Sequence, residues 1–216
     1  MKLASILCCT GIVAILGSGS AMAQSPVLPA PGSQTEESSG PGIETNQIET
    51  IRIQAAVKTI EDGRILVENL SEENSPEEIL LLTSVFDTRF VNGETGFQAA
   101  PADLKAGDII YADIRPTMAE SLPPQMTAET IICRMPDGVQ APDYILTEAF
   151  EWQEDETWRL TSSLGTVYQV PQDCPVISYG MNELTTFRNI SKSKKLLVWS
   201  DEDNQAQRIV KLPARW

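Results

Sequence analysis

Polar and apolar residues alternate along nearly every hydrophobic segment between residues 48 and 213, with the period of two that is typical of half-buried β-strands. The segment "AAVKTIEDGRILVENL" has this pattern on both sides of Asp62-Gly63, a dipeptide favoured in tight hairpin turns. Further strands are expected in "EEILLLTSVFDTRF", with a break near Asp87, and in "GDIIYADI" and "AETIICR". The stretch "GETGFQAAPADLKAGD" is expected to be a loop with at most a helical turn near Ala100–Leu104. The pattern therefore predicts an all-β fold.

The second half of the chain repeats this order of segments. In "ILTEAFEWQEDETWRLTSS", a loop at Glu154–Glu156 would pair Phe150 with Leu160 and Trp152 with Trp158 on one strand face. "GTVYQVPQDCPVISYG" has a break at Asp173, and "KKLLVWSD" and "AQRIVKL" match the last two strands of the first half. We predict two tandem, structurally similar β-barrel or roll modules of the oligonucleotide/oligosaccharide-binding type, at residues 48–136 and 137–216. The alternative is generic alternation of short strands without duplication.

One segment differs between the two halves. Aligning Ile109 with Leu196, Trp199 with Ala112, and Ile131 with Ile209 leaves about nine extra residues in the first half, within Arg115–Thr127. Departures from a repeated scaffold often carry specificity, and adjacent prolines make an extended segment stiff. The segment is therefore either a binding loop or a clamp between the modules. As a binding loop it would use these residues: Arg115, Met118, Ser121, Leu122, Pro123, Pro124 and Gln125.

The N-terminus has the pattern of a secretory signal peptide. Lys2 precedes the apolar run "LASILCCTGIVAIL", and Ala21-Met22-Ala23 fits a cleavage site, so Met1–Ala23 is expected to be removed and the protein secreted. Cys8 and Cys9 lie inside the apolar run, which disfavours a lipoprotein. Residues 24–47 are rich in Pro, Gly, Ser and Glu and predict a disordered linker. No later segment is long and apolar enough to span a membrane.

Charge and cysteine content bound the partners. The formal net charge is −14, which disfavours binding to nucleic acid or to anionic membranes. Beyond the signal peptide only Cys133 and Cys174 remain, and an exported chain could hold them as a disulfide or as free thiols. The sequence leaves the oligomeric state open, with a monomer as one alternative.

Most catalytic and metal chemistry is disfavoured because the chain contains no histidine. Three weak motif matches are better interpreted as turns or loop surface: Ser191–Lys194 for a penicillin-recognising nucleophile, Asp201–Asn204 for calcium, and Glu77 with Glu78 for a glycosidase. Met118 and Met126 alone are a thin basis for a copper(I) site. We predict no catalytic residue, no metal and no cofactor.

The tryptophans allow a second binding hypothesis. Trp152 and Trp158 on one face could stack on sugar rings, as in carbohydrate-binding modules, or they could belong to the core of the second module. Trp199 is expected between the modules or at a sheet face.

The segments "GDIIYADIRPTMAESLPPQMTAETIIC" and "LLVWSDED…AQRIVKLP" carry a family resemblance. Over residues 50–213 the chain resembles secreted β-rich domains of Gram-positive bacteria that often accompany a copper-amine-oxidase N-terminal-like domain, which is absent here. The matching positions are Gly107, Asp108, Tyr111, Pro116, Met118, Ser121–Gln125 and Val198–Asp201. The resemblance implies an exported module of unestablished activity and carries over no catalytic residue.

The sequence thus favours a secreted, non-catalytic binding protein of the cell envelope, with a protein or a cell-wall component as partner. The alternatives are a carbohydrate-binding module using Trp152 and Trp158, and a hydrolase based on carboxylates.

Overall fold

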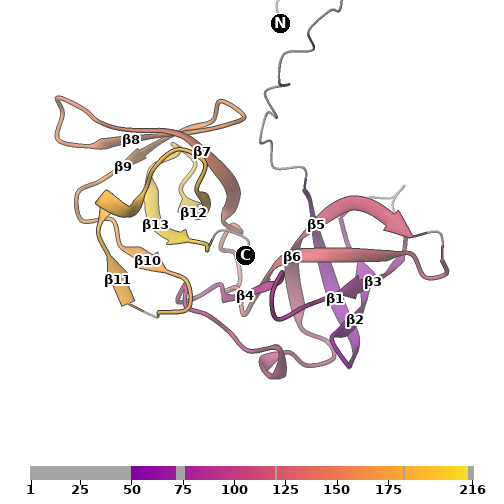
Figure 1. Cartoon of the computed structure of the whole chain (residues 1–216). Coiled ribbons are helices and arrows are strands. Elements are labelled where there is room, and N and C mark those ends of the chain that lie inside the picture. Colours follow the sequence, from indigo (N-terminus) through magenta and orange to yellow (C-terminus); the bar gives the residue numbers. More distant parts are fainter. Residues whose placement is uncertain (1–49, 72–75, 120, 182, 214–216) are drawn as a thin grey trace, which may run out of the picture. The chain divides into compact units, whose positions relative to one another are not determined.

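The computed structural model describes residues 50–71, 76–119, 121–181 and 183–213. The expected signal peptide and linker lie outside these residues. The described chain contains thirteen strands and two short 3-10 helices, which confirms the all-β prediction (Figure 1). Strands β1–β6 form one sheet and strands β7–β13 form another.

The first sheet closes into a barrel. Its strands are β1 (Ile51–Glu61), β2 (Arg64–Asn69), β3 (Glu78–Leu82), β4 (Arg89–Asn92), β5 (Ile109–Ala119) and β6 (Gln125–Cys133). They pair in the order β3-β2-β1-β5-β6-β4, and an additional β3–β6 pairing joins β1, β2, β3, β5 and β6 into a ring. One edge of β6 therefore pairs with β5, and its other edge pairs first with β3 and then with β4.

Local sequence accounts for the turns of this barrel. Asp62 and Gly63 both have positive φ, as a two-residue hairpin turn between β1 and β2 requires. The interruption of the strand expected near Asp87 is the connection at residues 83–88, between β3 and β4. The helical turn expected near Ala100–Leu104 is the 3-10 helix η1 (Pro101–Asp103).

The second sheet stays open. Its strands are β7 (Asp143–Trp152), β8 (Trp158–Ser162), β9 (Val167–Val170), β10 (Val176–Ser178), β11 (Glu183–Thr185), β12 (Lys195–Ser200) and β13 (Ala206–Lys211), with η2 (Phe187–Asn189) before β12. They pair in the order β11-β10-β13-β12-β7-β8-β9. Strand β11 and helix η2 have no counterpart in the sequence expectations. Where β3 pairs with β6 in the barrel, β9 meets the start of β13 through one bridge, Gln169 with Gln205.

The two sheets share a pairing pattern. β5–β6 and β12–β13 are antiparallel hairpins, and β4 and β10 lie parallel to the second strand of each hairpin. Ile131 pairs with both Phe90 and Ala112, and Ile209 pairs with both Val176 and Val198. The correspondence supports the duplication, which stays a prediction.

This register corrects the sequence alignment by one residue. Ala112 corresponds to Val198, so Asp113 rather than Ala112 is the counterpart of Trp199, and Leu196 corresponds to Ile110 rather than to Ile109. Ile110 and Leu196 are both buried, whereas Ile109 is exposed. A slip of one residue exchanges the buried and exposed faces of a strand. Because Ile109 and Ile110 are adjacent and equally apolar, the sequence does not show which of them aligns with Leu196.

The apolar side chains form three clusters. One fills the barrel and includes Ile53, Val67, Leu81, Ile110 and Ile131. The second lies within the β7–β13 sheet and includes Leu160, Tyr168, Leu196 and Ile209. The third, which we call the joint, combines residues of both sheets: Val91, Ile132, Ile177, Leu197, Trp199, Val210 and Leu212. Of the two places expected for Trp199, between the halves or at a sheet face, the structure has the first.

Polar contacts also cross the joint. Glu129 of β6 accepts hydrogen bonds from the Tyr144 hydroxyl and the Lys195 ammonium, both at 2.8 Å. Arg208 donates to the backbone carbonyl of Glu94 at 2.7 Å and lies over the ring of Trp199. The two sheets are therefore held together by apolar packing and by charge-assisted hydrogen bonds.

Candidate functional site

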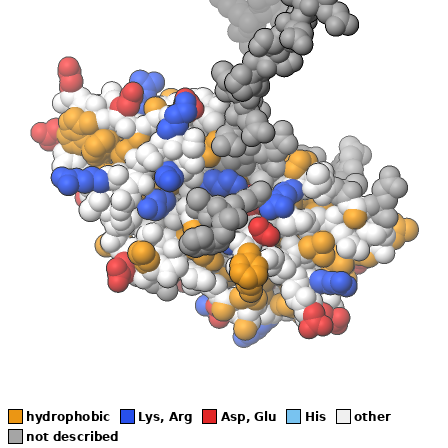
Figure 2. All heavy atoms as spheres, in the orientation of Figure 1, with side chains coloured by type: hydrophobic (Ala, Val, Ile, Leu, Met, Phe, Trp, Pro, Cys, Tyr) orange, Lys and Arg blue, Asp and Glu red, His pale blue; other side chains and the backbone are white. Residues whose placement is uncertain are grey.

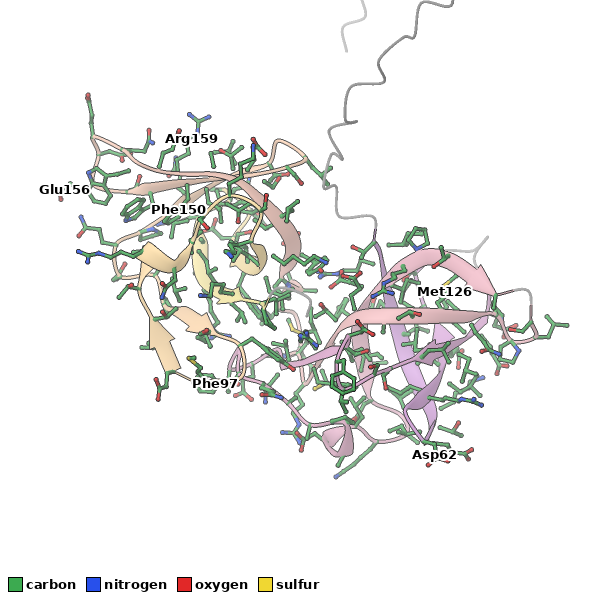
Figure 3. All side chains as sticks on the ribbon, in the orientation of Figure 1. Asp62, Phe97, Met126, Phe150, Glu156 and Arg159 are labelled. Atoms are coloured by element: carbon green, nitrogen blue, oxygen red, sulfur yellow. The ribbon has the colours of Figure 1, made fainter. Side chains whose placement is uncertain are left out.

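The residues expected as a binding loop form the end of a long hairpin. Strand β5 runs to Ala119 and β6 starts at Gln125, so most of the segment that sequence reasoning assigned to a loop is strand. Met118 pairs with Met126, and Ala119 pairs with Gln125. Figure 1 shows β5 and β6 as neighbouring strands, and Figure 3 labels Met126 on this hairpin. Of the described residues, Ser121–Pro124 lie beyond this ladder; together with Gln125, the first residue of β6, we call them the hairpin tip.

The extra residues of the first half close the barrel. Gln125, Met126 and Thr127 at the start of β6 pair with Leu80, Leu81 and Leu82 of β3. The corresponding strand β13 begins at Ala206, and Gln205 just before it forms a single bridge to Gln169 of β9. The insertion therefore does not act as a clamp between the two sheets at its tip, because that end of the hairpin is bound to β3 of its own barrel.

The hairpin tip exposes one apolar side chain. Leu122 has 99% of its surface exposed, whereas Ser121, Pro123, Pro124 and Gln125 are half-buried. The Ser121 hydroxyl donates to the Pro123 carbonyl at 2.8 Å, and the Leu80 amide of β3 donates to the Pro124 carbonyl at 2.9 Å. The peptide bond between Leu122 and Pro123 is cis. The tip thus presents Leu122 on a backbone that is fixed on both sides.

Arg115 lies apart from the tip. Its guanidinium pairs with Glu129 at 3.1 Å and with Asp87 at 3.9 Å, near the joint. The structure therefore separates Arg115 from Leu122. The residues predicted to bind together do not form one site, because Arg115 lies near the joint and Ser121–Gln125 lie at the hairpin tip. The side chain of Met118 lies outside the described residues, so the two-methionine copper hypothesis gains no support.

The second candidate is an aromatic cluster on the β7–β8 hairpin. The predicted pairs are confirmed, because Phe150 lies opposite Leu160 and Trp152 lies opposite Trp158. Phe150, which Figure 3 labels, stacks on Trp158 with ring centroids 4.7 Å apart and an interplanar angle of 2°. Phe187 of η2 packs against both rings with centroids 5.9 Å away.

This aromatic cluster is partly core and partly surface. Phe150, Trp158 and Phe187 are half-buried against the second hydrophobic cluster. Trp152 packs edge-on against Trp158 at 5.2 Å and keeps 48% of its surface exposed. Hydrophobic side chains gather on the visible face near this hairpin, beside basic and acidic groups (Figure 2). Sequence reasoning found both tryptophans and missed Phe187, which belongs to the unpredicted helix η2.

The two cysteines lie in different clusters. Cys133 belongs to the barrel and Cys174 to the β7–β13 sheet, and both thiols are free. Burial raises the pKa of Cys133 to about 11 and that of Cys174 to about 12. The disulfide alternative is not formed in this structure, because each thiol packs inside its own cluster.

The weak motif matches lie where the turn interpretation places them. The Asp201 carboxylate accepts from the amides of Asp203 and Gln205 in the turn between β12 and β13. Ser191–Lys194 forms the turn before β12, in which Ser193 has positive φ. Glu78 pairs with Lys58 at 2.7 Å on the surface of the barrel. Within the described residues no group of three or more His, Cys, Asp or Glu side chains is placed to hold a metal ion.

Comparison with known proteins gives one partial similarity. The chain is 34% identical over 95 residues to a protein named "Protease inhibitor" from Brevibacillus choshinensis. The matched segment is 42% of this chain and 29% of the relative, so the chain spans less than a third of that protein's length. No protein-family model matches the chain. In the described part of the chain, no helix has the length and hydropathy needed to cross a membrane.

Proposed function

We propose that this protein is a non-catalytic inhibitor module that binds a protease through the hairpin tip. The observation that carries the proposal is the full exposure of Leu122 between half-buried neighbours. A large apolar side chain held in water gains free energy when it enters an apolar pocket of a partner. Protease clefts offer such pockets to extended segments of a partner.

The support beneath the tip favours tight binding. Strands β3 and β5 hold both sides of β6, and the bonds from Ser121 and Leu80 fix the two proline carbonyls. Prolines further restrict the backbone, so little conformational entropy is lost when a partner is bound. A contact side chain on rigid elements is also more precisely placed than one on a loose loop.

The similarity to a protein named a protease inhibitor points to the same class of role, although the match covers only part of each chain. It favours a protein partner and a non-enzymatic function. The N-terminal sequence adds the proposal that the protein is secreted and acts at or near the cell envelope, where it would meet extracellular proteases. A cell-wall component is the alternative partner, and the similarity to a protein named a protease inhibitor does not favour it.

The test is inhibition of a panel of secreted serine, cysteine and metalloproteases by the purified protein. A variant with Leu122→Gly, Pro123→Ser and Pro124→Gly should lose inhibition and keep the wild-type melting temperature. The matched control is Leu164→Gly, which removes an apolar side chain that is 77% exposed in the second sheet. Inhibition that survives the tip replacement would overturn the assignment of the tip.

A carbohydrate-binding role is the second candidate, and the exposed ring of Trp152 favours it. Its half-exposed face adjoins a rigid stack, as sugar-binding platforms require. Wall polysaccharides should then shift the tryptophan fluorescence of the wild type and leave the fluorescence of Trp152→Ala unchanged. A fluorescence spectrum that no polysaccharide moves would count against this role and leave the tip proposal intact.

A further inference from the structure

A cavity of about 570 Å³ lies beside the β3–β4 connection, away from the residues assigned above. Its walls are mainly apolar and include Val85, Phe90, Ala99, Pro101 and Tyr179. The volume is within the range of sites that hold small organic ligands. Arg89, the first residue of β4, also lines it.

Arg89 is a buried cation that pairs with no acidic side chain in the described part of the chain. Only 8% of its surface is exposed. Its Nη1 donates to the Phe86 carbonyl at 2.8 Å and, at 3.4 Å, to the Thr88 carbonyl. Its guanidinium carbon lies 6.0 Å from the centroid of the Tyr179 ring. Among the described residues, no carboxylate lies within 4.0 Å of this guanidinium, although a buried charge is costly unless it is paired.

The nearby carboxylates have other partners. Asp87 pairs with Arg115, and Glu129 pairs with Arg115 and Lys195. Lys195 also lies in this charged region, and burial together with Arg115 and Arg89 lowers its pKa. Asp87 and Glu129, which lie beside Arg89, are thus paired with Arg115 and Lys195, and an added anion could pair with Arg89 itself.

The rim of the cavity adjoins an exposed apolar turn. Val85, which lines the cavity, is 84% exposed; the next residue, Phe86, is 71% exposed, and its carbonyl accepts the hydrogen bond from Arg89. Two adjacent apolar side chains in water cost free energy that contact with an apolar ligand would recover. The charge and the rim together describe one kind of ligand, with an anionic end and an apolar body.

We propose that this cavity binds a monocarboxylate with an apolar body, with the carboxylate on Arg89 and the body between Val85, Ala99 and Tyr179. Arginine suits this role because its planar fork matches a carboxylate in a bidentate pair. The carboxylate can belong to a free acid or to the C-terminus of a bound peptide, since both offer the same group.

Calorimetric titration of the full chain distinguishes these sources. Octanoate is compared with 1-octanol, and acetyl-Ala-Leu with a free carboxylate is compared with its amide. We expect at least one acid to bind ten-fold tighter or more than its neutral counterpart. A preference for octanoate alone identifies a free acid, and a preference for the peptide acid alone identifies a chain end. If both acids are preferred, the site recognises the carboxylate whatever it is attached to.

Two variants locate the binding. Arg89→Met should abolish the preference for the acid, whereas Arg188→Met, at an exposed position in η2, should retain it. Val85→Glu places a competing carboxylate at an exposed position of the rim, so it keeps the proposal testable if Arg89→Met does not fold. It should weaken binding of the acid at least ten-fold, whereas Val139→Glu, which adds the same charge at a different exposed position, should not. Equal binding of acids and neutral counterparts, or an acid preference that persists in Val85→Glu and in a folded Arg89→Met, would overturn the proposal.

Discussion

Cys133 and Cys174 each lie inside a hydrophobic cluster with the pKa of the thiol raised by burial to about 11 and about 12, respectively. The thiolate is the reactive form, so both side chains should resist alkylating reagents in the native protein at pH 8. We expect Cys133 and Cys174 together to give less than one reactive thiol per molecule with a disulfide reagent before guanidinium is added. Both cysteines should react after it is added. Rapid reaction of either thiol in the native protein would contradict its burial.

The same pKa shifts predict a loss of stability in alkaline solution. A thiol that is harder to ionise when folded retains its proton between the unfolded pKa of 9.0 and the folded pKa of about 11 for Cys133. In that window the native state binds more protons than the unfolded state, so the free energy of unfolding falls as the pH rises. Urea titrations at pH 8 and 10.5 should show this fall, and Cys133→Ala with Cys174→Ala should reduce it.

The two tryptophans of the aromatic cluster should differ in their contribution to stability. Trp158 packs against both Phe150 and Phe187, so Trp158→Ala should cost about 2 kcal/mol of unfolding free energy or more. Trp152→Ala should cost less than about 1 kcal/mol, because half of that ring already contacts water. Chemical denaturation measures both values. Equal losses would show that Trp152 is as much a core residue as Trp158.

At the residue level, the sequence predicted what strand alternation and turn residues determine. It paired Trp152 with Trp158 correctly because the length of a hairpin loop sets the register of its strands. It placed Ile109 one position wrongly because Ile110 beside it is equally apolar. It gave no signal for Arg89, since a single arginine at a strand start shows neither its burial nor its missing partner.

The β5–β6 hairpin is the element in which the structure departs most from the sequence interpretation. The sequence assigns this segment to a loop because the alignment of the two halves leaves about nine extra residues there, with Pro123 and Pro124 adjacent. In the structure Pro116 lies within β5, in the stretch between Ile114 and Met118 where the β5–β6 register shifts, and the other two prolines form the tip. The parallel pairing with β3, which closes the barrel, joins segments far apart in the chain and leaves no local sequence pattern.

Closure of the barrel through this hairpin predicts a local response to substitution. Met126→Pro removes an amide from β6 where it pairs with Leu81, and a buried hydrogen-bonding group that loses its partner costs about 1–3 kcal/mol. The Leu80 amide, which donates to the Pro124 carbonyl, should then exchange with solvent at least a hundred-fold faster.

Two references make this exchange measurement specific. The Leu197 amide of the second sheet should keep its protection in Met126→Pro, and the Leu80 amide should keep its protection in Leu122→Gly. An unchanged Leu80 amide in Met126→Pro would show that the β3–β6 pairing does not hold the barrel closed.

At the scale of the whole molecule, the joint makes the two sheets depend on each other. Seven buried apolar residues from both sheets form it, with the contacts of Glu129 and Arg208 beside them. The wild type should therefore unfold in a single calorimetric transition. Trp199→Ala should divide this into two, because it removes the largest apolar side chain of the joint and leaves the other two clusters intact.

The control for the joint is Trp152→Ala, which removes a ring of the same kind outside it and should retain one transition. A single transition in Trp199→Ala would indicate that the remaining contacts of the joint are enough to keep the two sheets unfolding together.

The sequence predicted two similar halves, and the shared pairing pattern supports them. It could not predict that only one half closes, since closure depends on the strand extension that the insertion supplies.

The most direct test of the account is the dissociation constant for a protease that the wild-type protein inhibits, compared between Leu122→Ala and Trp152→Ala. If the hairpin tip is the contact, Leu122→Ala weakens binding at least ten-fold, or about 1.4 kcal/mol, and Trp152→Ala binds like the wild type. The opposite ranking, or wild-type affinity in both variants, would contradict the account.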